Sequence, residues 1–133
     1  MTAKEWLSRA RKMSGRLRAL QTSKEQAFAR ATSNTVGGGE HVSGGEPADK
    51  HAAYAELSLA VDRQIEKLER TRAEILQVIG LVEDNVLSTL LTEYYVNDKM
   101  WEEIAAEQNY SKRHVLRLHG QALQVIRELT GME

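Results

Sequence analysis

Residues 100–123, MWEEIAAEQNYSKRHVLRLHGQAL, decide how the C-terminal part of this chain folds. Apolar residues recur at helical spacing as far as Gln108, residues 109–111 interrupt the pattern, and a second apolar stripe begins at Val115. Ser111 suits the start of the second helix because its hydroxyl can accept a hydrogen bond from a free amide of the first turn. The pattern predicts two helices joined by a tight turn, a helix-turn-helix.

The second of these helices begins with a dense group of basic residues. Lys112, Arg113, His114 and Arg117 follow the capping serine directly. When a helix-turn-helix docks on DNA, the first residues of its second helix reach base edges and phosphates, so long side chains with several hydrogen-bond donors are needed there. The alternative explanation is an ordinary helical bundle with a solvated basic face.

Charge is distributed unevenly along the chain, although 18 Lys and Arg against 19 Asp and Glu leave a formal net charge of only −1. Residues 109–127 contain four Lys or Arg residues and no Asp or Glu. Residues 83–107 contain seven acidic residues, with Lys99 as the single Lys or Arg. This segregation favours a nucleic-acid partner over a simple helical bundle.

The run EYYVNDKMWEEIAAEQNYSKRHVLRLHGQALQVI, residues 93–126, resembles region four of bacterial sigma factors, the domain that reads the upstream hexamer of a promoter. The whole chain, which opens with TAKEWLSRARKM after its first methionine, is similar to a family of small phage-encoded transcriptional regulators with a sigma-like C-terminus. The resemblance implies a DNA-binding regulator of phage or prophage transcription. Its partners would be double-stranded DNA and RNA polymerase.

The resemblance also implies which side chains meet DNA. With the capping serine included, the expected DNA-binding residues are Ser111, Lys112, Arg113, His114, Arg117 and Gln121. Within this set, His114 and Gln121 fall where the family touches the DNA backbone, and the Lys and Arg residues fall at bases or neighbouring phosphates. Leu116 departs from the sigma pattern, in which a polar or basic residue is frequent. An exposed leucine there would pack against a thymine methyl group or meet a protein.

Residues 83–133 are expected to form one DNA-binding domain of three helices. Asp84 is a suitable N-cap for the first of them. The inward face of that helix is predicted to carry Val86, Leu87, Leu90, Leu91 and Tyr94. Asn97 and Asp98 supply the turn into the helix-turn-helix. The last helix is predicted over residues 112–130, before Gly131, whose lack of a side chain suits a helix C-terminus.

Residues 1–82 are expected to form a helical hairpin or coiled coil. Thr2 and Glu5 have the spacing of a capping box at the start of its first helix. Apolar residues then recur at steps of three and four, at Trp6, Ala10, Met13, Leu17 and Leu20. The other faces of this helix are basic, with Lys4, Arg9, Arg11, Lys12, Arg16, Arg18, Lys24 and Arg30. Such faces can meet phosphates, an acidic helix of the same chain or a second subunit.

A glycine-rich segment, residues 32–46, separates this helix from a longer one and is predicted to be a flexible loop. Pro47 suits the first turn of the second helix, in which apolar residues keep helical spacing from Tyr54 to Val82. The two helices could pair within one chain or between two chains, because seam residues look alike in both arrangements. We favour a homodimer that contains intra-chain hairpins.

The composition argues against several functional classes. The 133 residues include no Cys, so disulfides, thiol nucleophiles and cysteine-ligated zinc are excluded. His114 and His119 lie five positions apart on the predicted helix and do not share a face for a metal ion. We expect no enzymatic activity and no cofactor. No apolar run reaches the roughly 20 residues that span a bilayer, so the protein is expected in the cytoplasm and not in a membrane.

Two other functions fit the same pattern. Small terminase subunits, which take part in phage DNA packaging, also join a helix-turn-helix to helical oligomerisation segments. A large ring-shaped oligomer would favour that function. A coiled-coil adaptor would use the helix-turn-helix to bind a protein, and an exposed Leu116 would suit it. All three functions rest on the same predicted all-α fold.

Overall fold

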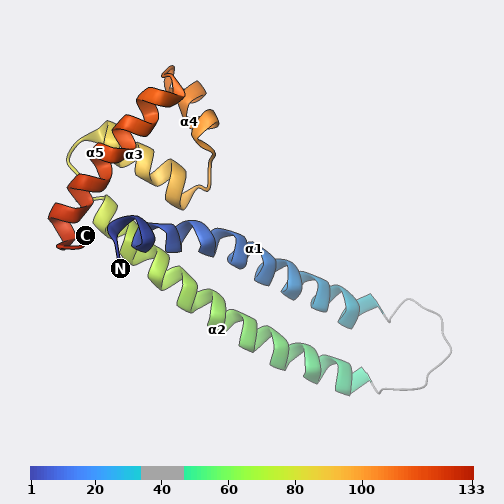
Figure 1. Cartoon of the computed structure of the whole chain (residues 1–133). Helices are drawn as coiled ribbons and strands as arrows, with labels where there is room; N and C mark the ends of the chain where they lie inside the picture. The colour runs from blue at the N-terminus through green and yellow to red at the C-terminus, as the bar shows by residue number, and fades with distance from the viewer. Residues whose placement is uncertain (34–46) are drawn as a thin grey trace. The chain divides into compact units, whose positions relative to one another are not determined.

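The computed structural model describes residues 1–33 and 47–133, with the side chains of residues 1–32 and 51–133. The predicted all-α fold is confirmed: the described residues contain helices and no strand (Figure 1). The helices are α1 Ala3–Ser33, α2 Pro47–Ile79, α3 Asn85–Leu91, the π-helical turn η1 Thr92–Val96, α4 Trp101–Gln108 and α5 Lys112–Thr130. Of the predicted loop 32–46, the first two residues end α1, and residues 34–46 lie outside the described residues. Among the described residues, no helical stretch combines the length and the apolar character that a membrane span needs.

The chain divides into two compact units. The first combines Met1–Gly15 with Glu69–Glu133, and the second is Arg16–Leu68. The sequence predicts a division between residues 82 and 83 instead, which would separate the hairpin from the helix-turn-helix. The observed boundary differs from the predicted one because the first turns of α1 and the last turns of α2 share an apolar core with the C-terminal helices.

The core of the first unit draws buried residues from α1, α2, α3, η1 and α5. Its contribution from α1 is centred on Leu7, which is fully buried, whereas Trp6 is only partly buried against the same core. The predicted α1 seam is therefore one residue off at its start, although Ala10 and Leu17 are buried as expected. Because this end of α1 packs into a core built by several helices, its inward face is not set by pairing with α2 alone.

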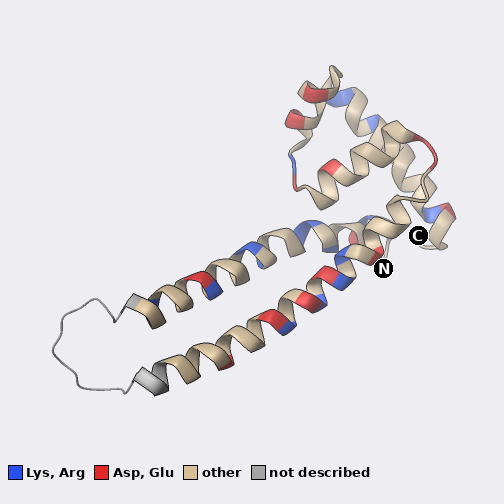
Figure 2. Cartoon of the chain, turned by 180° about the vertical axis from the view of Figure 1, so that it is seen from behind, with Lys and Arg blue, Asp and Glu red and all other residues tan. Residues whose placement is uncertain are grey.

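The second unit consists of the rest of α1 and α2, which run side by side in opposite directions (Figures 1 and 2). Nη2 of Arg16 donates to Oε1 of Gln64 at 2.9 Å, and Nζ of Lys24 lies 2.9 Å from Oδ1 of Asp62. Leu17, Ala27 and Val61 are buried in this unit, while Phe28, Leu57 and Leu59 are exposed apolar side chains. The hairpin is thus made within one chain. The predicted homodimer stays a prediction.

The helix-turn-helix and the helix before it form as the capping residues predict. Oδ1 of Asp84 accepts hydrogen bonds from the amides of Val86 and Leu87 at 2.9 and 3.1 Å, which confirms it as the N-cap of α3. The buried face of α3 carries the predicted Leu87, Leu90 and Leu91. A second small core between α3, α4 and α5 contains Leu90, Ile104, Ala105 and Val115.

Two details of this face differ from the prediction. Val86 is 41% exposed, and the fully buried aromatic residue is Tyr95, with Tyr94 only half-buried. For Tyr94 and Tyr95 the reason is the π-helical turn after α3, because a π turn adds a residue to the helical repeat and rotates the side chains along it. Val86 lies before that turn, in the first turn of α3, so the π turn does not account for its exposure. The predicted turn at Asn97 and Asp98 follows the π-helical turn directly, with Asp98 in a left-handed conformation (φ 62°).

Candidate nucleic-acid interface

Helix α5 begins and ends at the predicted residues. Ser111 has an extended backbone (φ −75°, ψ 155°), and its Oγ accepts a hydrogen bond from the His114 amide at 3.1 Å. Gly131 ends the helix in a left-handed conformation (φ 75°). Because the cap fixes where the helix starts, it also fixes the direction in which each side chain of the first turns points.

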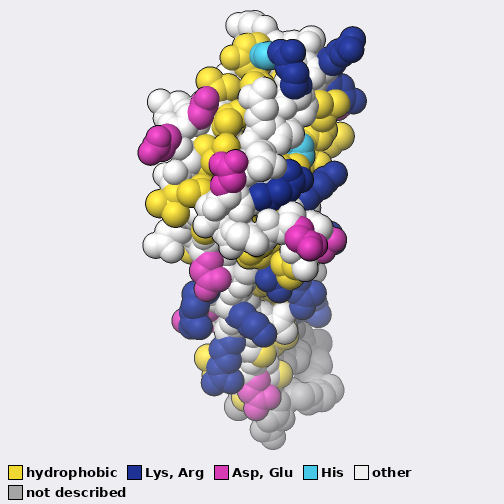
Figure 3. Space-filling model, turned by 60° about the vertical axis from the view of Figure 1, so that its left-hand side comes forward, with side chains coloured by type: hydrophobic (Ala, Val, Ile, Leu, Met, Phe, Trp, Pro, Cys, Tyr) yellow, Lys and Arg dark blue, Asp and Glu magenta, His cyan; other side chains and the backbone are white. Residues whose placement is uncertain are grey.

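The six predicted DNA-binding residues extend from the N-cap of α5 to the middle of the helix. Ser111, Lys112, Arg113, Arg117 and Gln121 are exposed, and His114 is half-buried. Four of the six residues, Ser111, Arg113, His114 and Arg117, line a surface depression of about 320 Å³, whereas the other two do not line it. Basic side chains and a histidine gather at the upper end of Figure 3, the end at which α5 begins in Figure 1.

His114 holds an arginine in place at this surface. Its ring packs edge-on against Tyr110, with ring centroids 4.7 Å apart and an interplanar angle of 84°. Nη2 of Arg117 lies 2.7 Å from Nδ1 of His114, and because a guanidinium can only donate, the imidazole nitrogen accepts. The sequence predicts a DNA-backbone contact for His114, and that stays a prediction. Within the chain, the hydrogen bond to its Nδ1 orients Arg117.

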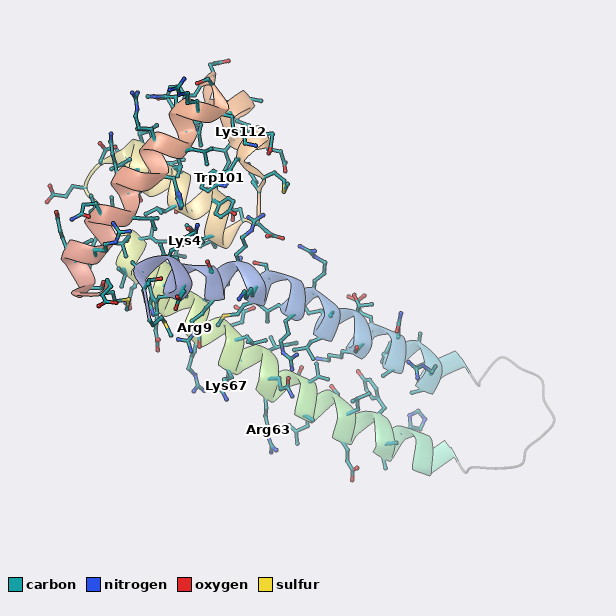
Figure 4. The ribbon with its side chains drawn as sticks, in the orientation of Figure 1. Lys4, Arg9, Arg63, Lys67, Trp101 and Lys112 are labelled. Atoms are coloured by element: carbon teal, nitrogen blue, oxygen red, sulfur yellow. The ribbon has the colours of Figure 1, made fainter. Side chains whose placement is uncertain are left out.

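The first helix of the motif is acidic, which at first sight opposes a phosphate partner. Its three exposed carboxylates, Glu102, Glu103 and Glu107, all have partners within the chain. They pair with Nζ of Lys112 at 3.5 Å, the Met100 amide at 3.1 Å and Nζ of Lys99 at 2.8 Å, respectively. Figure 2 shows acidic segments on α4 near basic segments on α5, and Lys112 is labelled in Figure 4. The Glu102–Lys112 pair is exposed and therefore weak, so a phosphate could replace the carboxylate.

The Glu102–Lys112 pair allows a test of whether charge near the start of α5 affects DNA binding. Glu102→Gln is expected to strengthen binding to double-stranded DNA about threefold at low salt, because it removes a negative charge that competes with phosphate for Lys112. Fluorescence anisotropy with a labelled duplex measures the change. Glu56→Gln, an exposed position of the second unit, makes the same change in net charge. Equal gains for both variants would contradict a local effect.

The sequence did not reveal how α1 is attached to the segment that leads into α4. Nη1 of Arg11 donates to the carbonyl oxygens of Tyr94 and Lys99 at 2.6 and 2.9 Å and lies 3.4 Å from Oδ1 of Asp98. The Arg11 guanidinium also lies 4.0 Å from the centroid of the Tyr94 ring. In the same segment, a hydrogen bond from the Lys99 side chain lowers the pKa of the Glu93 carboxyl group. Arg11 and its partners are more than 80 positions apart in the chain, so no local pattern signals them.

A group of aromatic rings connects the segment that Arg11 contacts to α5. The ring of Tyr94 stacks on Trp101, with centroids 3.7 Å apart and an interplanar angle of 7°, and the Trp101 ring lies 4.6 Å from that of His119. Trp101, the first residue of α4, is labelled in Figure 4. The arrangement fixes α4 and α5 relative to each other, which sets the direction in which the basic end of α5 points.

His119 is a buried polar residue on the inward face of α5, 8% exposed. Its Nε2 and the hydroxyl of Tyr95 form a hydrogen bond of 2.6 Å. Burial, and to a smaller extent the charge of Lys4, lowers the pKa of His119 from 6.5 to about 4. Burial also raises the pKa of the Tyr95 hydroxyl. Both groups are therefore neutral in the folded protein at neutral pH.

The low pKa of His119 predicts a loss of stability in acid. Between its ordinary pKa of 6.5 and the folded value of about 4, the unfolded chain binds a proton that the folded chain does not, so the free energy of unfolding falls as the pH falls through this range. From pH 7 to pH 5 the contribution of His119 amounts to about 2 kcal/mol.

Urea titrations at pH 7 and pH 5 measure this contribution. The decrease between the two pH values should be about 2 kcal/mol smaller in His119→Gln than in the unmodified protein. The same decrease in both proteins would contradict a neutral, buried His119. Should the variant fold poorly, NMR titration of the His119 ring in the unmodified protein decides the question, because a ring that titrates near pH 6.5 would also contradict it.

No protein-family model, curated protein or solved structure matches the chain. The likeness of residues 93–126 to sigma region four therefore stays a prediction that rests on those residues.

Proposed function

We propose that this protein is a sequence-specific double-stranded-DNA-binding regulator of transcription, with α5 as the helix that enters the major groove. The observation that carries the proposal is the exposed basic end of α5. Lys112, Arg113 and Arg117 project from its first two turns, and residues 109–127 contain no acidic residue. A helix of this kind has a diameter of about 10–12 Å, and the major groove is about 12 Å wide.

Four of the six predicted DNA-binding residues have distinct physical roles in this proposal. Arg113 and Arg117 present planar guanidinium groups, which can bind the O6 and N7 atoms of guanine or two phosphate oxygens. His114 orients the guanidinium of Arg117 through the 2.7 Å hydrogen bond. Ser111 fixes the start of the helix, where the free backbone amides also favour a phosphate.

The regulatory part of the proposal rests on the sigma-like residues 93–126 and on the second unit. That unit carries exposed Phe28, Leu57 and Leu59, which suit contact with another protein. RNA polymerase or a second copy of the chain would be that protein. A dimer would place two copies of α5 on two half-sites of a DNA target.

Equilibrium binding and selection with a pool of random 30-base-pair duplexes test the proposal. We expect the logarithm of the binding constant to fall with the logarithm of salt concentration with a slope of about −3, since three to four cations would meet phosphates. Selection should enrich one shared sequence, and its position upstream of genes in the source genome would support regulation. Weak binding that is insensitive to salt and enriches no sequence would contradict the proposal.

A second candidate function is that of a protein-binding adaptor. The exposed Leu116, 42% accessible among the basic residues of α5, is the observation that favours it. An adaptor would use the same helix face on a protein surface. DNA binding with a steep salt dependence would count against this function.

A further inference from the structure

The exposed face of α5 contains a position without a side chain. Successive residues of an α-helix are rotated by about 100°, so Arg113, Arg117, Gly120 and Gln124 share one face, with Leu116 at its edge. All five are exposed. Gly120 thus lies on the same face as the two arginines that the proposed function assigns to DNA, one turn beyond Arg117.

Nothing within the described chain requires glycine at this position. A Cβ atom added to Gly120 would have no heavy atom within 4 Å among the described residues, apart from its two chain neighbours and the helix backbone within four residues. Glycine in the interior of a helix is less favourable than alanine. Gly120 therefore lowers the stability of α5, and no packing within the described residues compensates for this loss. A close approach by another molecule is a physical reason that would favour a glycine there.

The charges around Gly120 indicate what that molecule is. Arg113 and Arg117 lie two turns and one turn before it on the same face, and acidic residues are missing from this part of the helix. If two copies of the chain met through this face, arginines would be brought against arginines, which is unfavourable. A polyanion with a groove that fits a helix is complementary to the same face.

On the basis of the proposed function, we infer that Gly120 is the point of closest approach between α5 and the major groove, and that Leu116 contacts a thymine methyl group there. The small residue lets the helix backbone move toward the base edges. The leucine, one turn earlier, then lies within reach of the only apolar group that a base pair presents in the major groove. The DNA target therefore contains a T·A pair opposite Leu116.

Gly120→Ala tests the close approach because its effects on stability and on binding have opposite signs. Alanine should raise the midpoint of thermal unfolding by about 3 °C and weaken binding to the duplex enriched from the random pool about tenfold, because the added methyl group displaces base contacts. Gly15→Ala is the matched control, since Gly15 is also helical and has no heavy atom within 4 Å of an added Cβ. It should raise stability similarly and leave binding unchanged.

Uracil substitution tests the contact made by Leu116. Uracil lacks only the methyl group of thymine, so replacing thymine in the enriched duplex should weaken binding of the unmodified protein about fourfold, the effect of exposing one methyl group. Leu116→Ala should bind the thymine duplex less tightly and should no longer distinguish thymine from uracil.

The possible outcomes separate this inference from the proposed function. If no sequence is enriched, the proposed function itself fails. If a sequence is enriched but Gly120→Ala binds it as tightly as the unmodified protein, or if uracil has the same effect on the unmodified protein and on Leu116→Ala, DNA binding stands and this inference is overturned. Reduced self-association of Gly120→Ala, with DNA binding intact, would assign the face to a second copy of the chain.

Discussion

Replacing Arg113 and Arg117 together by alanine is expected to weaken DNA binding about 100-fold, since a well-placed arginine contributes about 1–3 kcal/mol at a base or a phosphate. The magnitude of the salt slope should also decrease by about two if both guanidinium groups meet phosphates. Both side chains are exposed, so the variant should keep the far-ultraviolet circular dichroism and the unfolding midpoint of the unmodified protein. Fluorescence anisotropy across a series of salt concentrations measures both effects.

The matched control removes the same charge from another part of the chain. Arg18→Ala/Arg63→Ala alters two exposed arginines of the second unit and should change the affinity less than about twofold. Figure 4 labels Arg63 on α2. If both double variants lose affinity equally, binding depends on overall charge, and α5 has no special role.

Leu7→Ala is expected to lower the free energy of unfolding by about 3 kcal/mol. Leu7 is fully buried in the core where α1 and α2 meet the C-terminal helices. Truncation would remove apolar contacts and leave a cavity among helices that come from both ends of the chain. Urea titration followed by circular dichroism measures the loss.

An exposed leucine provides the control for this substitution. Leu81 is 62% accessible, so Leu81→Ala should cost less than about 1 kcal/mol. If Leu7→Ala costs no more than Leu81→Ala, the start of α1 does not belong to the common core. In that case the division between residues 82 and 83 expected from the sequence would describe the protein better.

The parts of the fold that could be predicted are those that depend on neighbouring residues. Asp84 and Ser111 cap helices with their own side chains, and Gly131 ends one because its backbone can adopt φ 75°. The bounds of α5 follow from these residues and from the apolar stripe between them. A cap or a stripe acts over one or two turns, so a short stretch of sequence contains the whole signal.

The parts that could not be predicted depend on residues distant in the chain or on irregular geometry. Leu7 rather than Trp6 points into the core because α1 packs against the C-terminal helices, and Arg11 finds its partners beyond residue 93. Tyr95 becomes buried through a π-helical turn, which an ideal helical period does not anticipate. These features require the fold to be known first.

For the candidate interface, the sequence correctly placed the exposed basic residues at the start of α5. It did not show that His114 contacts Arg117, because the same residue types would also suit a direct contact with DNA. Nothing in the sequence singles out Gly120 either, because only the structure shows that an added Cβ would meet no heavy atom within 4 Å.

NMR chemical-shift mapping with a random-sequence 20-base-pair duplex tests most directly whether α5 binds DNA. On addition of the duplex to ¹⁵N-labelled protein, the largest changes should fall on the amides of residues 111–121. The amides of the second unit, Arg16–Leu68, should change little. Changes concentrated on the basic faces of α1, or none along α5, would contradict the proposal that α5 is the DNA-reading helix.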